Sequence, residues 1–534
     1  MSRIFPPALL ALIFGIAITV NASAATYYIA ANGSDSNSGT SQSTPWAHLP
    51  GMATWTGGHT PTAGDTFILR GCDVWANSNF PVTWSWSGTS SNPIVIDRDT
   101  TWYNVANCPT AWNRPIFNAG GAVMGGTECA GFNQYVKFTS ATYVNMKWIE
   151  LTGYYWNANA GGSCGYDHTG ILVEATYSDY VTVDSWYVHN WSHGPSAGDS
   201  DHFWYLTGNP NCGHCLFTNG VVNNTDSSIC GSSGTRCGGG WEWSTTNSVF
   251  NWMVNELKPY TQGTFCNNNL SGVGHGFDGT HENIIEPVGG SAGPNYYYFC
   301  NNYIHDTASG ELQFGNTGDV YYIWNNINVQ GQNGRNWAFP QQPGANMQLH
   351  FWNNTIVPAA GQPAIWTCNS CNPATWASVD IENNFVVTTN SEAHGTLPGL
   401  IACSPNDCGT NPFPASGTRT IANNIVVTPT SASSMGYTNT PPYVYSPQND
   451  NCNGISTNCP IGAGANLSGS WPSSFSYNDT SYACVQQTVN TVIQSVCNQR
   501  VTIARLSTGA WDIGAYEFGS GAPTAPTGLG AVVQ

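Results

Sequence analysis

The chain has 534 residues, enough to bury a large core, yet only 8% of them are charged, against about 25% in typical soluble proteins. The net charge of −18 argues against nucleic acid or an anionic membrane as partner. It also disfavours a polyanionic substrate unless a cation intervenes. Composition stays even along the chain, with no internal linker, which predicts one elongated domain rather than several.

The first residues have the pattern of an export signal. Arg3 supplies positive charge, residues 8–20 form an unbroken apolar run, and Ala22-Ser23-Ala24 fits a small-residue cleavage site. The run is too short to span a bilayer. We therefore expect residues 1–24 to be a signal peptide and the mature protein to be secreted or associated with the cell surface.

Eighteen cysteines in an exported chain predict several disulfides. Two pairs are close in sequence, Cys212/Cys215 and Cys368/Cys371, a spacing also used for zinc binding and redox chemistry. Because no Cys/His quartet repeats at zinc-finger spacing, structural disulfides in surface loops are the better interpretation.

A repeated unit begins after about residue 170. It is a short apolar strand, then Asn-Asn, then a second apolar strand, as in YYFCNNYI, YIWNNINV, HFWNNTIV, DIENNFVV and TIANNIVV. These five copies lie 24, 28, 30 and 40 residues apart, which is the length of a solenoid coil with variable loops. Val, Ile, Tyr, Phe and Trp dominate the runs, as strands require. Stacked coils would place each Asn over the next, so their side-chain amides would form a hydrogen-bonded ladder.

The predicted fold is all-β, a single-stranded right-handed parallel β-helix with disulfide-stabilised loops and caps. We expect the helix to cover residues 25–518, with residues 26–49 capping one end. Residues 452–497 lack the repeat and are expected to form a disulfide-tied cap or a long loop. Residues 519–534 are rich in Gly and Pro and are expected to be a tail or linker.

Both ends of the chain resemble a group of secreted bacterial β-helix proteins. The opening TYYIAANGSD, the strand GDTFILRG and the closing DIGAYEF are similar to the corresponding segments of that group. The resemblance implies the pectate-lyase-like β-helix fold. It implies no single activity, because the group contains polysaccharide lyases, glycosidases and proteins of unknown role.

Charge is concentrated in the centre of the chain. Residues 167–319 contain 15 of the 30 carboxylates and 8 of the 12 histidines. Counting back from each Asn-Asn pair by one strand and one turn reaches an earlier strand of the same coil, and equivalent positions stack at about 4.8 Å. These strands predict one polar stripe made of Glu242, Glu256, Lys258, Glu282 and Glu311. For any one of these residues alone, an ordinary solvated face is the better interpretation.

The segment VNELKPYTQGTFCNNNL resembles the Glu-x-Lys strand of the chondroitinase B and alginate lyase group. That resemblance implies that Lys258 is the base that removes the proton α to a uronate carboxylate. It also implies Ca²⁺ held by an acidic set, here Glu256, Glu282 and Glu311. An assisting arginine is part of the pattern; no motif marks it here, and Arg335 and Arg236 are the candidates by elimination. The alternative is a structural salt bridge between neighbouring coils.

The other candidate residues are those expected to bind a polysaccharide or to take part in its cleavage. The candidate catalytic set is Lys258, Arg335, Glu256 and His281, and the candidate substrate-binding set is Glu242, Glu311, Gln313, Trp204 and Trp337. Tryptophans in loops can stack on sugar rings, although core packing is the default for each one. We expect a monomer with a polysaccharide as partner, no nucleic acid and no transmembrane segment.

Three functions remain open at this point. One is a calcium-assisted lyase of a uronate-containing polysaccharide. The second is a non-catalytic glycan-binding or adhesion protein, which the low lysine and arginine content and the anchor-like tail favour. The third is a glycoside hydrolase that uses paired carboxylates such as Glu242, Glu256, Glu282 or Glu311.

Overall fold

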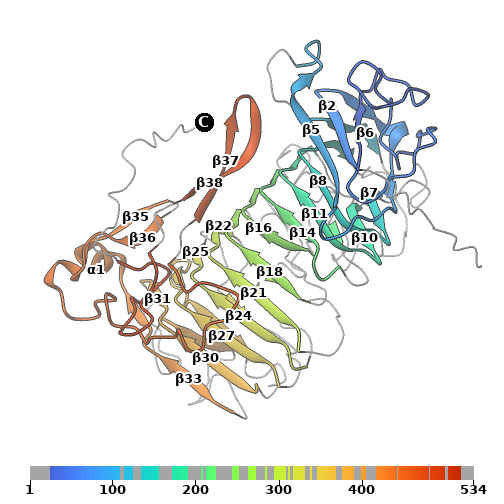
Figure 1. The fold of residues 1–534 in the computed structure, drawn as a ribbon. Helices are drawn as coiled ribbons and strands as arrows, with labels where there is room; N and C mark the ends of the chain where they lie inside the picture. Colours follow the sequence, from blue (N-terminus) through green and yellow to red (C-terminus); the bar gives the residue numbers. More distant parts are fainter. Residues whose placement is uncertain are drawn as a thin grey trace, which may run out of the picture.

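The computed structural model describes residues 24–108, 114–123, 134–155, 171–190, 206–207, 212–223, 243–251, 262–271, 283–285, 294–307, 311–312, 317–330, 337–339, 346–368, 376–389, 399–404, 417–441, 443–479, 482–499 and 503–518. The chain winds repeatedly through three parallel sheets (Figure 1), so that each strand pairs with the equivalent strand one turn later. The predicted right-handed parallel β-helix is confirmed.

The first sheet has thirteen strands among the described residues. They are β1 (Thr26–Ile29), β2 (Thr66–Gly71), β5 (Ile94–Tyr103), β8 (Thr142–Lys147), β11 (Asp179–Asp184), β14 (Leu216–Thr218), β16 (Ser244–Thr246), β18 (Gly263–Cys266), β21 (Tyr296–Cys300), β24 (Val320–Trp324), β27 (Gln348–Trp352), β30 (Ser378–Glu382) and β33 (Arg419–Ala422).

The second sheet has twelve strands in the described part of the chain. They are β3 (Val74–Ala76), β6 (Ile116–Val123), β9 (Glu150–Tyr155), β12 (Tyr187–Val188), β15 (Val221–Asn223), β17 (Val249–Asn251), β19 (Asn269–Ser271), β22 (Tyr303–Thr307), β25 (Ile327–Gln330), β28 (Thr355–Val357), β31 (Phe385–Val387) and β34 (Ile425–Val427).

The third side of the helix is formed by two shorter sheets. One contains β4 (Val82–Trp84), β7 (Gln134–Thr139), β10 (Ile171–Thr176) and β13 (Leu206–Thr207); the other contains β20 (Asn283–Ile285), β23 (Glu311–Leu312), β26 (Trp337–Phe339), β29 (Ile365–Cys368) and β32 (Ile401–Ser404). We call both together the third sheet. It follows the second sheet and precedes the next strand of the first sheet in every complete coil.

The Asn-Asn pairs form the turn between the first and second sheets. The first Asn of each pair has a left-handed backbone, with φ between 50° and 62° at positions 267, 301, 325, 353, 383 and 423, a conformation that Asn adopts more readily than most residues. The second Asn points inward and donates its amide to the next coil. Hydrogen bonds of 2.8 to 3.1 Å join Asn268, Asn302, Asn326, Asn354, Asn384 and Asn424 in sequence. The predicted asparagine ladder is therefore confirmed.

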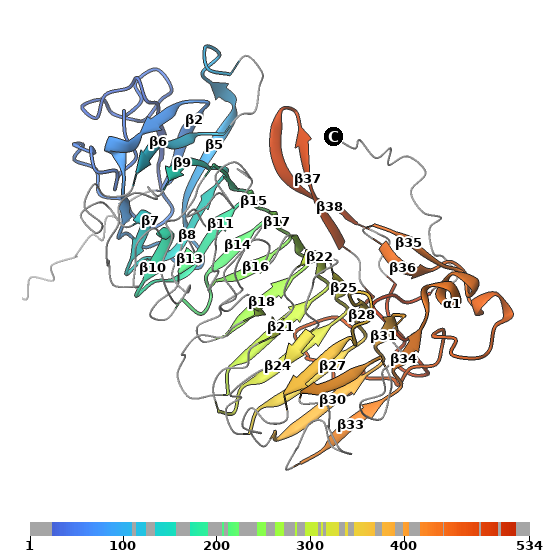
Figure 2. The ribbon, with the colours of Figure 1, turned by 180° about the vertical axis from the view of Figure 1, so that it is seen from behind.

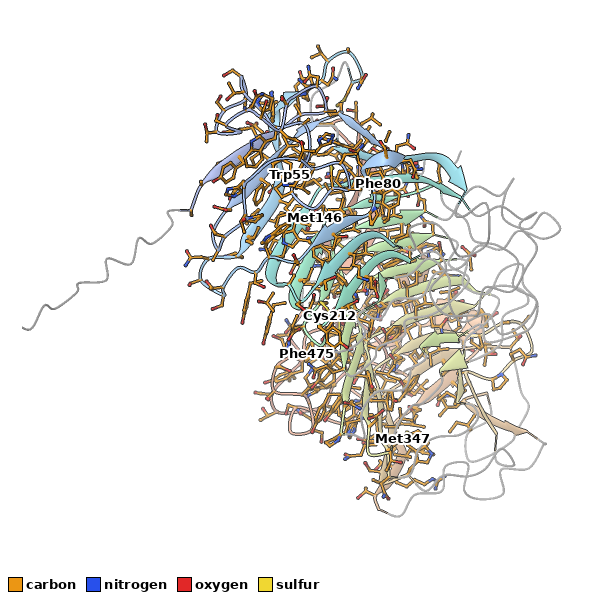
Figure 3. All side chains as sticks on the ribbon, turned by 90° about the vertical axis from the view of Figure 1, so that its right-hand side faces the viewer. Trp55, Phe80, Met146, Cys212, Met347 and Phe475 are labelled. Carbon is orange, nitrogen blue, oxygen red and sulfur yellow. A yellow bond between two sulfur atoms is a disulfide. The ribbon has the colours of Figure 1, made fainter. Side chains whose placement is uncertain are left out.

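A continuous apolar core fills the interior of the coils. Its members come from alternate positions of the strands, as expected when one face of each sheet is buried. Phe80, Met146 and Met347 belong to this core and mark successive levels of the helix in Figure 3. At the N-terminal end, Trp46, Leu49 and Met52 join the same core, so the residues after β1 cover the first coil.

The parallel coils end at β34, well before the expected boundary at Phe518. The chain then forms helix α1 (Pro429–Ser434), the hairpin β35 (Tyr437–Thr440) and β36 (Tyr443–Pro447), and a second antiparallel hairpin, β37 (Tyr482–Val489) and β38 (Val492–Gln499). Figures 1 and 2 show the β37–β38 hairpin beside the middle of the helix, and α1, β35 and β36 beside its C-terminal coils. Residues that were expected to continue the helix, or to cap it, instead lie along its side.

We call the described residues between 462 and 518 the C-terminal strap. It contacts the left-handed asparagines that the coils present at their turns. The Asn383 side chain is bonded to both the N–H and the carbonyl oxygen of Ala465, and Asn325 donates to the carbonyl oxygen of Asn478. The strap therefore satisfies polar groups on turns that belong to successive coils.

Five disulfides occur among the described residues, which agrees with the predicted use of cysteine. They are Cys72–Cys108, Cys212–Cys215, Cys266–Cys300, Cys452–Cys459 and Cys484–Cys497. The third joins neighbouring strands of the first sheet, and the last joins the two strands of the β37–β38 hairpin. In the part of the chain that is described, no helix has the length and apolar character needed to cross a membrane.

Candidate functional site

The residues of the predicted polar stripe occur at equivalent points in the order of strands along the chain. Glu242 lies between β15 and β16, and Glu256 and Lys258 lie between β17 and β18. Glu282 directly precedes β20, and Glu311 begins β23. In chain order, each position follows a strand of the second sheet and precedes a strand of the first sheet. Among these residues the structure describes only the backbone of Glu311, which lies in the third sheet.

The side-chain geometry of this stripe is not described. Eight of the candidate residues lie outside the described part of the chain: Glu242, Glu256, Lys258, His281, Glu282, Gln313, Arg335 and Trp204. The backbone of Glu311 pairs with Asn283 on one side and Ala338 on the other. Trp337 pairs with Ile365, whose side chain is fully buried in the core. These pairings show which residues of β20, β23, β26 and β29 lie opposite one another in the third sheet.

One ion pair on the third side is described in full. Lys137 on β7 and Glu174 on β10 occupy paired register positions, with Nζ and Oε2 3.2 Å apart. Both side chains are partly exposed, so the pair faces the outside of the helix. Neither residue is part of the polar stripe that the sequence predicts. Their contact shows that charged residues of neighbouring coils meet on this face.

Calcium ligands cannot be assigned within the described residues. No group of three or more His, Cys, Asp or Glu side chains is arranged there to hold a metal ion. The proposed ligands Glu256 and Glu282 lie outside that part of the chain, and so does the side chain of Glu311. The calcium site stays a prediction.

A second group of titratable residues lies on the outer face of the first sheet. Tyr322, His350 and Asp380 occupy one row across β24, β27 and β30. The Tyr322 and His350 rings stack with centroids 4.6 Å apart, and His350 Nδ1 lies 3.7 Å from Asp380 Oδ2. Glu382 is two residues further along β30, beside Trp352 in the register. Asn423 donates a hydrogen bond of 3.3 Å to Glu382 Oε2.

The two carboxyls of this group have opposite pKa shifts. Burial, followed by the neighbouring Asp380, raises the pKa of Glu382 to about 8. Burial alone would raise the pKa of Asp380, but polar contacts with His350, Glu382 and Trp352 outweigh burial and hold it below its usual range. Opposite shifts are expected for neighbouring carboxyls, because the charge of one disfavours ionisation of the other.

Asp380 and Glu382 are two residues apart on β30, so their side chains share the outer face of this strand. Sequence reasoning missed the pair because DIENNFVV was interpreted only as a copy of the repeat. The alternation of Asp380 and Glu382 with apolar residues was the available signal, since alternate strand positions share a face.

The strap contains a third charged group, which is buried. Arg505 donates a hydrogen bond of 2.7 Å from Nη1 to Glu517 Oε2, and its Nη2 donates to Asn325 on a coil turn. Burial raises the pKa of Glu517 to about 7 although Arg505 opposes the shift, and burial also raises the pKa of Asp512. The closing segment DIGAYEF is thus part of the packing between strap and coils.

No family model matches the sequence, and no curated protein matches it. Among solved structures, the chain is similar to a lacto-N-biosidase from Eubacterium ramulus, with 11% identity, a TM-score of 0.39, and coverage of 76% of this chain and 68% of the other. It is similar to a pectate lyase with 13% identity, a TM-score of 0.38, and coverage of 92% and 96%. An alginate lyase from Paenibacillus sp. str. FPU-7 has 12% identity, a TM-score of 0.25, and coverage of 68% and 91%. Because these TM-scores are low, the fold assignment rests on the strand pairing itself.

Proposed function

We propose that the protein is an extracellular polysaccharide-active enzyme, a lyase of a uronate-containing polysaccharide. The observation that carries the proposal is the concentration of charge in the centre of the chain: only 8% of all residues are charged, but residues 167–319 contain 15 of the 30 carboxylates. In chain order, Glu242, Glu256, Lys258 and Glu311 each follow a strand of the second sheet and precede a strand of the first sheet. The export signal and the disulfides support an extracellular location.

In this proposal Lys258 is the base. A lysine accepts the proton α to the uronate carboxylate only in its neutral form, so its environment must lower its pKa. Arg335 is the candidate for holding the substrate carboxylate, and His281 is the candidate for proton transfer to the leaving oxygen. Loss of the α-proton and of the leaving oxygen creates a carbon–carbon double bond in the new sugar end.

Calcium is included in the proposal because protein and substrate are both acidic. Glu256, Glu282 and Glu311 would hold the ion, since carboxylate oxygens are the ligands that Ca²⁺ prefers. Bound between protein and uronate, the ion would reduce their repulsion and make the α-proton more acidic. A melting temperature unchanged by chelator and by added Ca²⁺ would argue against this part of the proposal.

The test is a panel of pectate, alginate and chondroitin, each with and without Ca²⁺. Elimination produces an unsaturated end that absorbs in the ultraviolet, whereas hydrolysis produces reducing ends without that absorbance. Lys258→Ala should abolish the absorbance. Lys147→Ala is the control, because Lys147 lies on the first sheet, with its Nζ 4.0 Å from Asp97 Oδ2. Full activity of the Lys258 variant would exclude this residue as the base. Binding without any cleavage would favour the non-catalytic glycan-binding function.

A further inference from the structure

The two ends of the β-helix are covered to different degrees. At the N-terminal end, Trp46, Leu49 and Met52 close the core, and none of them is more than 4% exposed. At the C-terminal end, β33 and β34 are the last strands of the first and second sheets among the described residues. Figure 1 shows β33 at the lower end of the helix. Each of these two strands therefore has one edge without a neighbouring strand in the described structure.

The core positions of this last coil are partly exposed. Ile421 pairs with Ile381, and Val426 pairs with Val386. Ile381 and Val386 are fully buried, whereas Ile421 and Val426 continue the same inward-facing rows and are only partly buried against the core. Helix α1 packs with Val427 on the outer face of the second sheet instead. A further pair of strands stacked on this coil would bury both exposed side chains.

The asparagine ladder ends at the same coil. In its five preceding steps, the backbone N–H of each ladder asparagine donates to the side-chain oxygen of the next one, at 2.9 to 3.0 Å. Asn424 is the last member, and its backbone N–H has no such acceptor in the described part of the chain. A side-chain oxygen from a further strand would supply the missing acceptor.

The charged group at this end is an arginine that faces the core. Arg419 pairs with Val379, which is fully buried in the core, so the two side chains enter the helix in one row. Nε and Nη2 of Arg419 are buried and have no hydrogen-bond partner. Such groups are costly to leave unbonded, and a carboxylate accepts from two guanidinium N–H groups at once. The end of the helix therefore favours an occupant that brings a carboxylate.

Charge and coverage select one kind of occupant. A second copy stacked through the same end would bring two Arg419 side chains together, and residues 417–427 contain no carboxylate to pair with them. The N-terminal end of a second copy is closed by Trp46 and Leu49. Residues 519–534 also contain no Asp or Glu. The occupant that fits is a segment of another protein.

We propose that the C-terminal end of the β-helix binds an extended acidic segment of another protein, which adds one further pair of strands to the coils. Apolar side chains of the segment pack on Ile421 and Val426, and its carboxylate pairs with Arg419. Its backbone pairs with the edges of β33 and β34, the mode of binding known as strand addition. This surface is separate from the polar stripe, so the inference does not depend on the proposed lyase activity.

The test uses two peptides based on the sequence of Thr418–Val427. One is TRTIANNIVV, and the other, TETIANNIVV, has glutamate in place of the arginine. Stacked as a further coil, the second peptide places its glutamate over Arg419 and its apolar residues over Ile421 and Val426. Fluorescence anisotropy with the full chain should show that the glutamate peptide binds about tenfold more tightly, because the arginine peptide brings two like charges together.

Two protein variants test whether the preference comes from Arg419. Arg419→Glu should reverse it, so that the arginine peptide binds more tightly. Arg419→Gln keeps most of the side-chain length and removes the charge, so both peptides should bind about equally. Asn490→Asp is the matched control, because it changes the net charge by the same amount at an exposed position between β37 and β38. This control should keep the wild-type preference.

Three results would overturn the proposal: neither peptide binds, both peptides bind the wild type equally, or Arg419→Gln keeps the preference. Sedimentation of the chain alone tests the other occupant. A dimer that Ile421→Asp dissociates would mean that a second copy covers this end, and would overturn the proposal as well. A monomer that binds the glutamate peptide would support it.

Discussion

The side-chain amide of Asn353 donates a hydrogen bond of 3.0 Å to the carbonyl oxygen of Asp512, 159 residues further along the chain. This contact joins a turn of one coil to the closing segment of the strap. Asn353 is fully buried, so the strap covers the turn as well as bonding to it.

Removing one member of the ladder should destabilise the whole helix. Asn354 accepts hydrogen bonds from the backbone and side chain of Asn326 and donates to Asn384 and to the carbonyl oxygen of Ile323. Asn354→Ala leaves buried donors and acceptors without partners, which should cost about 2–4 kcal/mol. Denaturant unfolding measures the loss. Asn439→Ala, at an exposed position of β35, should change stability little, and an equal loss in both variants would contradict the prediction.

The buried arginine of the strap should be essential for its attachment. Arg505→Met leaves Glu517 without its 2.7 Å partner, and breaking a buried ion pair from one side costs about 3–5 kcal/mol. The double variant with Glu517→Gln should recover part of the loss, because the unpaired buried carboxyl is then neutral. Limited proteolysis would detect release of the strap. A single variant as resistant as the wild type would show that the pair is dispensable.

Gly514 should tolerate no side chain. Its φ is +104°, and an added Cβ would lie 2.9 Å from Phe385 Cβ and 3.0 Å from Thr355 Oγ1. Gly514→Ala should therefore destabilise the strap by about 1–3 kcal/mol. Gly469→Ala is the matched control, because Gly469 is also in the strap and an added Cβ meets nothing within 4 Å. Thermal melts that shift equally in the two variants would refute the argument.

Stability should fall as pH rises through the neutral range. Burial raises the pKa of Glu382 to about 8 and that of Glu517 to about 7. In each case the folded protein holds a proton that the unfolded chain releases near its ordinary pKa. The contribution is therefore complete below the ordinary pKa of 4.5 and is lost progressively as pH rises to about 7 for Glu517 and about 8 for Glu382.

Glu382→Gln tests the sign of this effect, since glutamine resembles the protonated carboxyl. Its melting temperature should match the wild type below about pH 4, where the carboxyl is protonated in both states, and should exceed it by a growing margin up to about pH 8. Asp450→Asn, which removes an exposed carboxyl elsewhere, should show no such crossover. A Glu382 variant that tracks the wild type across the whole range would show that this carboxyl titrates normally.

The sequence predicts the coils well because each repeat carries its own signal. Asn at the first position tolerates the left-handed turn, and Asn at the second position has a donor and an acceptor for the ladder, so the NN pairs mark both at once. The strap has no such signal. Ala465, Asn478 and Asp512 contact the coils through their backbone carbonyl oxygens. Every residue has this group, so the side chains at these positions do not predict the contact.

For the candidate site, the sequence predicts only between which strands each residue lies, not which residues of neighbouring coils are paired. Glu311 begins a strand on the expected side, but its partner in the register is Asn283, and insertions between coils prevent that pairing from being counted along the sequence. The pKa shifts of Asp380 and Glu382 could not be predicted from the sequence for a different reason. Their pKa shifts come from burial and from each other, and neither the depth of a side chain nor the proximity of two strands is visible in a repeat motif.

The strap also sets the order in which the molecule can be completed during synthesis. Coils can stack as soon as their own residues emerge, but the turns at Asn325, Asn353 and Asn383 receive their final partners from residues 465–514. Until that late segment arrives, a row of polar turns stays open to water and to other chains. A truncation that removes the strap should therefore leave a stack of coils whose flank is free to associate with its neighbours.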